Sequence, residues 1–246
     1  MPAGSIIFLS DAHLGAEPPE REAARTARLH GLLESLPGRA SSLFIVGDLF
    51  DFWFEYGTAI PRRLFPTLAA LDRVRRAGIP ITYLNGNHDF YLGTFLHETL
   101  GIRTVDGAVT VEEQGRRLWL HHGDGLIGGD NGYKFLRGIL RHPASIRMYG
   151  WLHPDLGIPL ALGVSGLSRH SREDRPPDTG RLWREIAEPR FREGYDGVLI
   201  GHFHQAVDRS EGGRQFLVLG DWIEHFTYAE LKDGRLSLKV WPEGGE

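Results

Sequence analysis

Histidine and aspartate are concentrated in five short clusters, and each cluster directly follows an apolar run of the chain. The clusters are Ser10-Asp11-Ala12-His13, Gly47-Asp48-Leu49-Phe50-Asp51, Gly86-Asn87-His88-Asp89, His121-His122-Gly123-Asp124 and Gly201-His202-Phe203-His204. Their imidazole nitrogens and their carboxylate and amide oxygens are ligands that suit Mn²⁺, Fe²⁺ or Zn²⁺. The chain has 12 histidines and no cysteine, which excludes thiolate ligands, disulfides and cysteine nucleophiles. The clusters therefore predict a metal centre with nitrogen and oxygen ligands alone.

The apolar runs before the clusters are typical of buried strands, and the strands we expect are Ile6–Ser10, Leu43–Val46, Ile81–Leu84, Arg117–His121, Gly197–Ile200 and Phe216–Leu219. Helices are expected at about 20–35, 61–77, 93–100 and 132–141, and in pieces over 145–190. Strands that alternate with helices indicate an α/β chain, in which sites form beyond the carboxyl ends of the strands. A single Asp-x-His or Gly-Asp is more often an ordinary turn, so the argument depends on all five clusters occurring together.

The composition, with 41% hydrophobic and 24% charged residues, is that of an ordinary globular chain. The length of 246 residues is long for one ordinary domain and short for two, which predicts a single domain over residues 1–246 with one large core and a modest insertion. No apolar run approaches the roughly 18 residues of a membrane span. The first apolar run, residues 6–9, is too short for a signal peptide and no basic residue precedes it, so a cytoplasmic protein is expected.

A basic segment lies inside this otherwise acidic chain. Residues 134–192 contain eleven Lys and Arg against six Asp and Glu, a net charge of +5, whereas the whole chain carries −4 and the remainder therefore −9. The part from 142 to 192 has several Pro and Gly breaks and no clear strand. This segment is either a solvated helical face or a cap that receives an anion.

The five clusters, in this order, resemble the signature of the calcineurin-like metallophosphoesterases. The resemblance extends from Asp11 to about Tyr228. It implies a four-layer αββα sandwich, in which two packed β-sheets are flanked by helices and two metal ions lie at the strand ends. It also implies a helical cap inserted at about residues 125–192.

The resemblance also assigns metal ligands. It implies one ion held by Asp11, His13 and His204, a second held by Asn87, His122 and His202, and Asp48 as the bridge between them. One carboxylate can hold two cations about 3.5–4 Å apart, the spacing that clamps a phosphoryl group. The cofactors expected are two divalent ions, with Mn²⁺ favoured and Fe²⁺ or Zn²⁺ as alternatives. His122 is preferred to His121 because the family histidine directly precedes Gly-Asp, and strand alternation then points His121 away from the metals.

The catalytic residues expected are Asp48, as the bridge, and His88. His88 follows a ligand, should face the leaving group, and as a cation or donor would stabilise phosphoryl charge or protonate the leaving oxygen. Asp51 and Asp89 either orient the ligands or are turn carboxylates, and the sequence favours neither interpretation.

Four segments are most similar to the UDP-2,3-diacylglucosamine pyrophosphatases of lipid A synthesis, which release UMP and 2,3-diacylglucosamine 1-phosphate. The segments are residues 47–53, residues 86–90, residues 122–135 with Asp130, Tyr133 and Lys134, and residues 220–222. The chain departs from the best-known members at His88, where they have Arg, and at Phe203, where they tend to have Thr.

The similarity implies a glycolipid substrate. The substrate-binding residues expected are Asn87, His88, Asp130, Tyr133, Lys134, Ser168, Arg169, Arg172 and His202. Apolar residues of the cap, among them Trp151 and residues 158–162, would line a groove for acyl chains or would only pack the cap onto the main fold. The basic residues would meet the diphosphate or the surface of the inner membrane, where the protein would bind peripherally.

Three other functions remain open. A phosphoesterase of this fold could act on a soluble substrate, such as a nucleotide or a phosphoprotein. A groove for acyl chains would distinguish an enzyme for the glycolipid from one for such soluble substrates. A catalytically inactive scaffold would have lost ligands, yet all seven ligand positions are filled. A nuclease is disfavoured because the body is acidic and no base-stacking aromatic patch accompanies the basic segment. The sequence does not define the oligomeric state.

Overall fold

The computed structural model describes residues 4–128, 138–172 and 177–243, with the backbone alone for residues 164–172. The first sheet consists of β1 (Ser5–Leu9), β2 (Ala40–Val46), β3 (Ile81–Leu84), β4 (Arg103–Val105), β10 (Thr227–Lys232) and β11 (Arg235–Val240). The second consists of β5 (Val109–Glu113), β6 (Arg116–His121), β7 (Gly197–Ile200), β8 (Ala206–Glu211) and β9 (Arg214–Leu219). All six strands expected from the sequence are present, with ends that differ by at most three residues.

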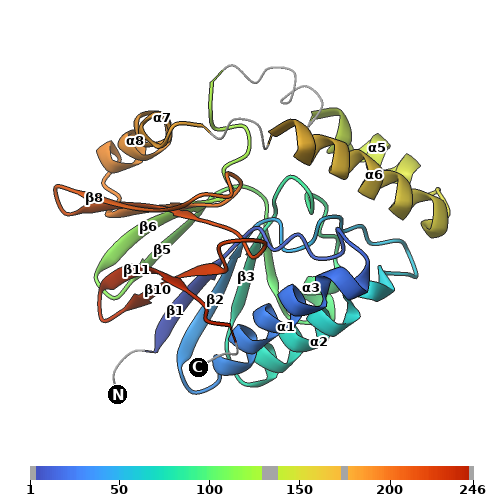
Figure 1. The fold of residues 1–246 in the computed structure, drawn as a ribbon, viewed down its shortest axis with the longest axis horizontal. Coiled ribbons are helices and arrows are strands. Elements are labelled where there is room, and N and C mark those ends of the chain that lie inside the picture. Colours follow the sequence, from blue (N-terminus) through green and yellow to red (C-terminus); the bar gives the residue numbers. More distant parts are fainter. Residues whose placement is uncertain (1–3, 129–137, 173–176, 244–246) are drawn as a thin grey trace.

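Each sheet has a parallel centre. The first sheet has the order β11-β10-β1-β2-β3-β4, in which β1 to β4 are parallel and β10 and β11 are antiparallel additions. The second has the order β5-β6-β7-β9-β8, in which β6, β7 and β9 are parallel and the outer strands are antiparallel. The carboxyl ends of β1, β2, β3, β6 and β7 therefore open towards the same end of the sandwich, as Figure 1 shows.

Alternate side chains of β1 face two different cores, as expected for a strand buried on both faces. Ile6 and Phe8 pack in the core between the sheets, whereas Ile7 and Leu9 pack against helices on the outer face. Those helices are α1 (Pro19–Ser35), the short 3₁₀ turn Arg62–Leu64 and α2 (Phe65–Arg76), with α3 (Phe95–Glu98) beside them. Leu29, Leu32 and Leu33 form the buried stripe of α1 at helical spacing.

The outer face of the second sheet is covered by α7 (Thr179–Leu182), a π-helical turn over Trp183–Ala187 and α8 (Glu188–Arg192). Trp183, Ile186 and Phe191 pack there against Phe216 and Val218 of β9. With this layer the predicted αββα arrangement is confirmed. Residues 179–192, which the sequence placed in a cap over the metals, thus pack against the second sheet.

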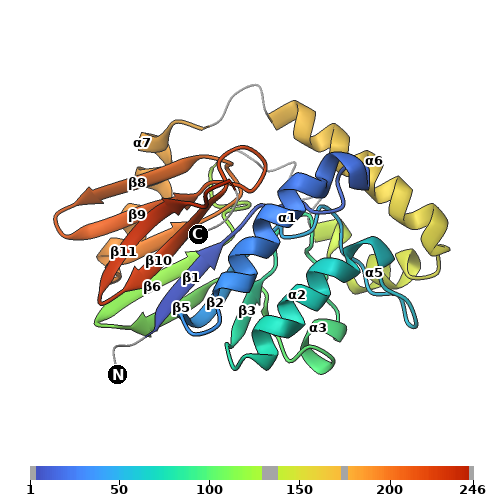
Figure 2. The same ribbon diagram turned by 60° about the horizontal axis from the view of Figure 1, so that its bottom comes forward.

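The helices α5 (Pro143–Tyr149) and α6 (Pro154–Arg172) stand outside both sheets, and we call residues 138–172 the arm (Figures 1 and 2). The base of the arm contacts an aromatic cluster, in which the Tyr149 ring centroid lies 4.7 Å from that of Phe54 and 5.8 Å from that of Phe52. The helix expected at 132–141 lies mostly outside the described residues. No helix in the described part of the chain combines the length and apolar character that crossing a bilayer requires.

Candidate metal centre

The five polar clusters meet at the shared carboxyl end of the two sheets. Asp11, Asp48 and Asn87 follow β1, β2 and β3 of the first sheet. His122 follows β6 of the second sheet, and His202 and His204 follow β7. Both sheets therefore contribute ligand side chains, and the site lies where their parallel centres end.

Asp11, His13 and His204 form one group with metal-ligating geometry, in which one donor atom from each residue lies within 4.8 Å of the others. His13 Nε2 is 3.1 Å from His204 Nε2 and 3.7 Å from Asp11 Oδ1. His204 Nε2 is 3.5 Å from the same Asp11 oxygen. These three donor atoms converge on a single point that a cation would occupy.

Asp48, His122 and His202 form a second group within the same 4.8 Å limit. His122 Nε2 lies 3.1 Å from Asp48 Oδ2 and 3.1 Å from Asn87 Oδ1, so the asparagine oxygen joins this group. His122 Nδ1 donates to the Val46 carbonyl oxygen over 3.0 Å, which leaves Nε2 as the ligand atom.

Asp48 lies between the two groups. Its Oδ2 is 3.1 Å from His122 Nε2 and 3.8 Å from His13 Nε2, and its Oδ1 accepts the His88 amide hydrogen over 2.9 Å. A third possible group, His13, Asp51 and His88, shares His13 with the first. Because the Asp51 carboxylate binds His13 Nδ1 at 3.2 Å, it fixes the ring while Nε2 faces the first group.

The backbone at this site is held in a conformation that costs free energy. Eight non-glycine residues of the described chain have positive φ, and five of them are the candidate ligands Asp11, His13, Asp48, His202 and His204. Such angles persist only where the surroundings enforce them, and they are concentrated at functional sites.

Two glycines allow the ligand loops to approach each other. A Cβ on Gly47 would lie 2.4 Å from His122 Nδ1, and a Cβ on Gly86 would lie 2.0 Å from Asp48 Oδ1. Any side chain at these positions would displace a candidate ligand. The glycines found in the sequence clusters thus serve close backbone approach as well as turning.

Asp89 links the cluster that contains Asp48 to its own cluster, residues 86–89, by hydrogen bonds. Its carboxylate accepts the amide hydrogens of Gly86 over 2.8 Å and of Asp48 over 3.1 Å, and the Tyr83 hydroxyl donates to it as well. Of the two interpretations left open for Asp51 and Asp89, the contacts of both favour the orientation of ligands over an ordinary turn.

The buried carboxylates stabilise the positively charged form of neighbouring histidines. Burial opposes a charge on His13, but its hydrogen bonds with Asp11 and Asp51 and the charge of Asp48 outweigh burial and raise the pKa of His13 to about 10. Burial opposes a charge on His122 in the same way, and the Asp48 carboxylate raises the pKa of His122 to about 10. A site that favours cationic imidazoles this strongly has the charge and the donor atoms that divalent cations require, so these residues fit metal ions.

His88 lies beside the two groups, with its ring 4.7 Å from that of His13. Its Nδ1 is 3.1 Å from the Asp51 carbonyl oxygen, which only accepts, so this nitrogen carries the hydrogen. Burial lowers the pKa of His88, although the charge of Asp48 opposes that shift. His121 lies apart from these groups, because its ring stacks on Trp119 and its Nδ1 accepts the Gly123 amide hydrogen.

The structure brings the seven expected ligands and His88 together. Of the remaining substrate contacts expected, Asp130, Tyr133 and Lys134 lie outside the described residues, as do the side chains of Ser168, Arg169 and Arg172.

Sequence reasoning missed three residues that support the site. Glu22 of α1 accepts the Gly15 amide hydrogen over 2.8 and 2.9 Å, and Arg25 donates to the His13 carbonyl oxygen over 3.3 Å. Arg141 of the arm donates to the Gly86 carbonyl oxygen over 3.0 Å. Their positions in the sequence carry no signal, because each contact depends on the tertiary fold.

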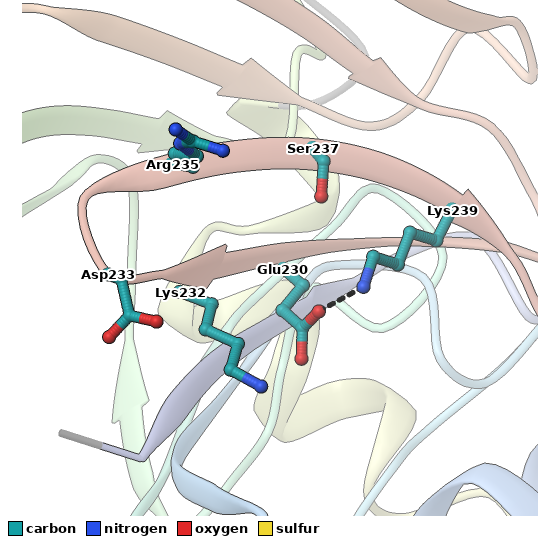
Figure 3. A pocket seen from close by; sticks show the side chains of 6 residues that line it. All are labelled: Glu230, Lys232, Asp233, Arg235, Ser237 and Lys239. Atoms are coloured by element: carbon teal, nitrogen blue, oxygen red, sulfur yellow. Dashed lines mark hydrogen bonds and ion pairs between the residues drawn. The ribbon is translucent and has the colours of Figure 1, made fainter. Parts of the chain in front are cut away.

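A surface hollow of about 390 Å³ lies elsewhere, on the β10–β11 hairpin (Figure 3). Glu230 and Lys239, which line it, pair with each other, and Lys232 and Asp233 also line it. The six residues that line the hollow all belong to β10, β11 or the turn between them, and none of them is a candidate metal ligand. The hollow is therefore separate from the metal centre.

The chain is similar in sequence to known phosphoesterases. The family model for calcineurin-like phosphoesterases matches residues 4–206. A Porphyromonas gingivalis protein named UDP-2,3-diacylglucosamine hydrolase is 31% identical over 242 residues, covering 91% of this chain and 92% of that protein. A protein of the same name from Chromobacterium violaceum is 30% identical over 227 residues, covering 89% and 90%. A solved structure of a predicted phosphoesterase from Streptococcus pneumoniae aligns with 100% of this chain and 93% of that one, at 16% identity and a TM-score of 0.45.

Proposed function

The chain belongs to the calcineurin-like phosphoesterase family, and from this membership we propose that it hydrolyses the pyrophosphate bond of UDP-2,3-diacylglucosamine. The products are UMP and 2,3-diacylglucosamine 1-phosphate, in lipid A synthesis. The observation that carries this function is the correspondence, over about nine-tenths of both chains, with proteins named for that hydrolysis. A metal centre with every expected ligand position filled supports an active hydrolase over an inactive scaffold.

The metal centre is proposed to hold two divalent ions, with Mn²⁺ as the favoured metal. Asp11, His13 and His204 would hold one ion, Asn87, His122 and His202 the other, and Asp48 both. The convergence of donor atoms in two groups, with Asp48 Oδ2 facing both, supports this assignment. Bound divalent ions supply Lewis-acid chemistry at the phosphoryl group and make water a stronger nucleophile at neutral pH.

His88 is proposed to act on the reacting phosphate. With the hydrogen of Nδ1 committed to the Asp51 carbonyl, the neutral ring presents a lone pair at Nε2, and only the cation presents a donor there. The bound diphosphate favours the cation, which would then donate to a phosphoryl oxygen or to the leaving oxygen. Asp51 holds both His88 and His13 in place for this role.

The arm is proposed to receive the acyl chains, with Asn87, His88 and His202 nearest the phosphates and Asp130, Tyr133, Lys134, Ser168, Arg169 and Arg172 as further contacts. The arm exposes large apolar side chains that a soluble fold would normally bury, with Trp151 80%, Leu156 69% and Leu160 60% exposed. Burial of each acyl methylene is worth about 0.8 kcal/mol, so eight methylenes would contribute about 6 kcal/mol to binding.

The direct test is hydrolysis of detergent-solubilised UDP-2,3-diacylglucosamine by the purified chain with Mn²⁺, with products identified by mass spectrometry. We expect UMP and 2,3-diacylglucosamine 1-phosphate in equal amounts, and little hydrolysis of UDP-glucose or other soluble nucleotides. Rapid hydrolysis of a soluble nucleotide without hydrolysis of the glycolipid would contradict the proposal and would favour the soluble-substrate function.

The double substitution Leu156→Gln and Leu160→Gln should raise the KM for the glycolipid by roughly tenfold or more, since each buried leucine contributes about 1.5–3 kcal/mol. The two leucines are four residues apart on one face of α6 and exposed, so stability should change little. Hydrolysis of bis-p-nitrophenyl phosphate should be unaffected. Val240→Gln, at a residue 63% exposed on β11, is the matched control and should leave both activities unchanged.

The same variants test the proposed location at the cytoplasmic face of the inner membrane. An exposed tryptophan beside leucines is typical of a surface that lies in the headgroup region of a bilayer. The unmodified chain and Val240→Gln should cosediment with vesicles of phosphatidylethanolamine and phosphatidylglycerol, and the double variant should remain largely in the supernatant. Equal cosedimentation of all three would exclude the arm as the membrane contact.

A further inference from the structure

Arg141 connects the arm to the metal-ligand loops. It lies two residues before the first residue of α5, and its side chain is 18% exposed. One guanidinium nitrogen donates to Asp106 Oδ1 over 2.8 Å, and the other donates to the Gly86 carbonyl oxygen over 3.0 Å. The second nitrogen is also 3.9 Å from Asp124 Oδ2, in the cluster that contains His122. One side chain of the arm thus reaches two of the five clusters.

The peptide that Arg141 contacts is fixed on every side. The Gly86 amide hydrogen is held by Asp89, its Cα lies against the Asp48 carboxylate, and its carbonyl oxygen is held by Arg141. The next residue is Asn87, whose Oδ1 faces His122 Nε2. A shift of the Gly86 carbonyl would therefore displace the Asn87 side chain from the position in which it faces the second group.

The planar guanidinium suits this position because it binds two acceptors at once in a fixed geometry. Asp106 holds it from the other side and also accepts from the Asn85 side chain over 3.0 Å. Since the Asp106 side chain is 74% exposed, the ion pair itself contributes little to stability. The hydrogen bond to the buried Gly86 carbonyl is the contact through which Arg141 can influence the ligand loop.

We propose that Arg141 is a positioning residue, through which the arm fixes the Gly86–Asn87 peptide and thereby the affinity of the second metal position and the rate of hydrolysis. This inference rests on the phosphoesterase activity of the proposed function, but not on the glycolipid as substrate. The arm then contributes to the metal centre as well as to substrate binding.

The test compares Arg141→Ala, Arg141→Lys and Asp106→Asn, with Arg147→Ala, an exposed arginine of α5, as the matched control. Mn²⁺ binding is measured by the electron paramagnetic resonance signal of free Mn²⁺, and turnover with bis-p-nitrophenyl phosphate. Loss of a residue that orients a ligand typically weakens metal affinity or activity by about 10–100-fold. We expect a weakening of that size at one of the two Mn²⁺ positions in Arg141→Ala, together with a lower kcat.

The conservative variants show whether Arg141 acts by its geometry, by its charge or only by stabilising the fold. Lysine keeps the charge but cannot bind two acceptors in one plane, so Arg141→Lys should bind the second Mn²⁺ more weakly than the unmodified chain. Asp106→Asn keeps an acceptor for Arg141 and should bind Mn²⁺ normally. Normal Mn²⁺ binding and kcat in Arg141→Lys would overturn the proposal, and so would equal weakening in Arg147→Ala. Because the readouts use Mn²⁺ and a generic diester, a failure to hydrolyse the glycolipid would count against the proposed function alone.

Discussion

Replacement of Asp48 by alanine is expected to abolish hydrolysis of every phosphate ester, with a loss of at least about 10³-fold in kcat, since metal-ion stabilisation of the transition state is worth several kcal/mol. The carboxylate is buried, and its Oδ2 faces His122 on one side and His13 on the other. Loss of a residue in either group alone would affect one proposed metal position, whereas loss of Asp48 would affect both. Metal content, measured by atomic absorption, should fall below two ions per chain.

Asp48→Asn is the matched variant for this prediction. The amide has the shape of the carboxylate and can still accept the His88 amide hydrogen through Oδ1. It lacks the negative charge that two cations share, so turnover should be nearly as low as in Asp48→Ala. Circular dichroism should show that both variants are folded. Near-normal turnover in Asp48→Ala would disprove the dinuclear arrangement.

Replacement of His88 by alanine should lower kcat by roughly 10²–10⁴-fold, the range for loss of a group that transfers or donates a proton. Metal content should stay near two ions per chain, because the ring binds Asp51 and lies beside the ligand groups. His97→Ala, at an exposed histidine of α3, is the control and should change neither quantity. If metal is lost in parallel with activity, His88 is a ligand and the assignment is wrong.

The pH dependence of kcat distinguishes a protonated His88 from a neutral one. Only the cation can donate from Nε2, so kcat of the unmodified chain should fall as the pH rises through the pKa of His88 in the substrate complex. Arginine is charged throughout this range, so His88→Arg should retain part of the rate and lose the decline at high pH. A decline that persists unchanged in His88→Arg would assign it to another group.

The sequence predicted β1, β2, β3, β6, β7 and β9, and it missed every edge strand of the two sheets as well as the buried strand β10. Strands β1 and β7 are continuous apolar runs because both of their faces are covered, and this pattern is easily read. β8 and β11 lie at sheet edges, and charged residues such as Asp208, Arg209 and Lys239 interrupt their apolar pattern. Their pairing is decided by neighbours that are adjacent only in the folded chain.

For the candidate site, the sequence predicted the ligands but not the residues that support them. A ligand that follows an apolar run is visible in the sequence because the sheet brings parallel strand ends together. The supports are not visible, because no motif marks them: Glu22 and Arg25 act from α1 on backbone groups of the preceding loop, and Arg141 acts from the arm on the distant Gly86 carbonyl. The arrangement of residues 179–192 against the second sheet was missed for a related reason, since a buried helical stripe does not reveal which surface covers it.

The pairing of β1 with β10 has a consequence for the order of synthesis and folding. Ile6 lies opposite Leu231 and Phe8 opposite Ala229, so β1 is paired with a strand more than 200 residues further along the chain. Contacts this distant in the sequence form slowly, and β1 cannot complete its sheet while the ribosome still holds the C-terminal strands. The nascent chain therefore exposes an apolar strand edge until β10 has been made, and the metal centre, which needs His202 and His204 beside Asp11, cannot assemble before β7 has been made. We accordingly expect coexpressed chaperones to raise the yield of folded protein.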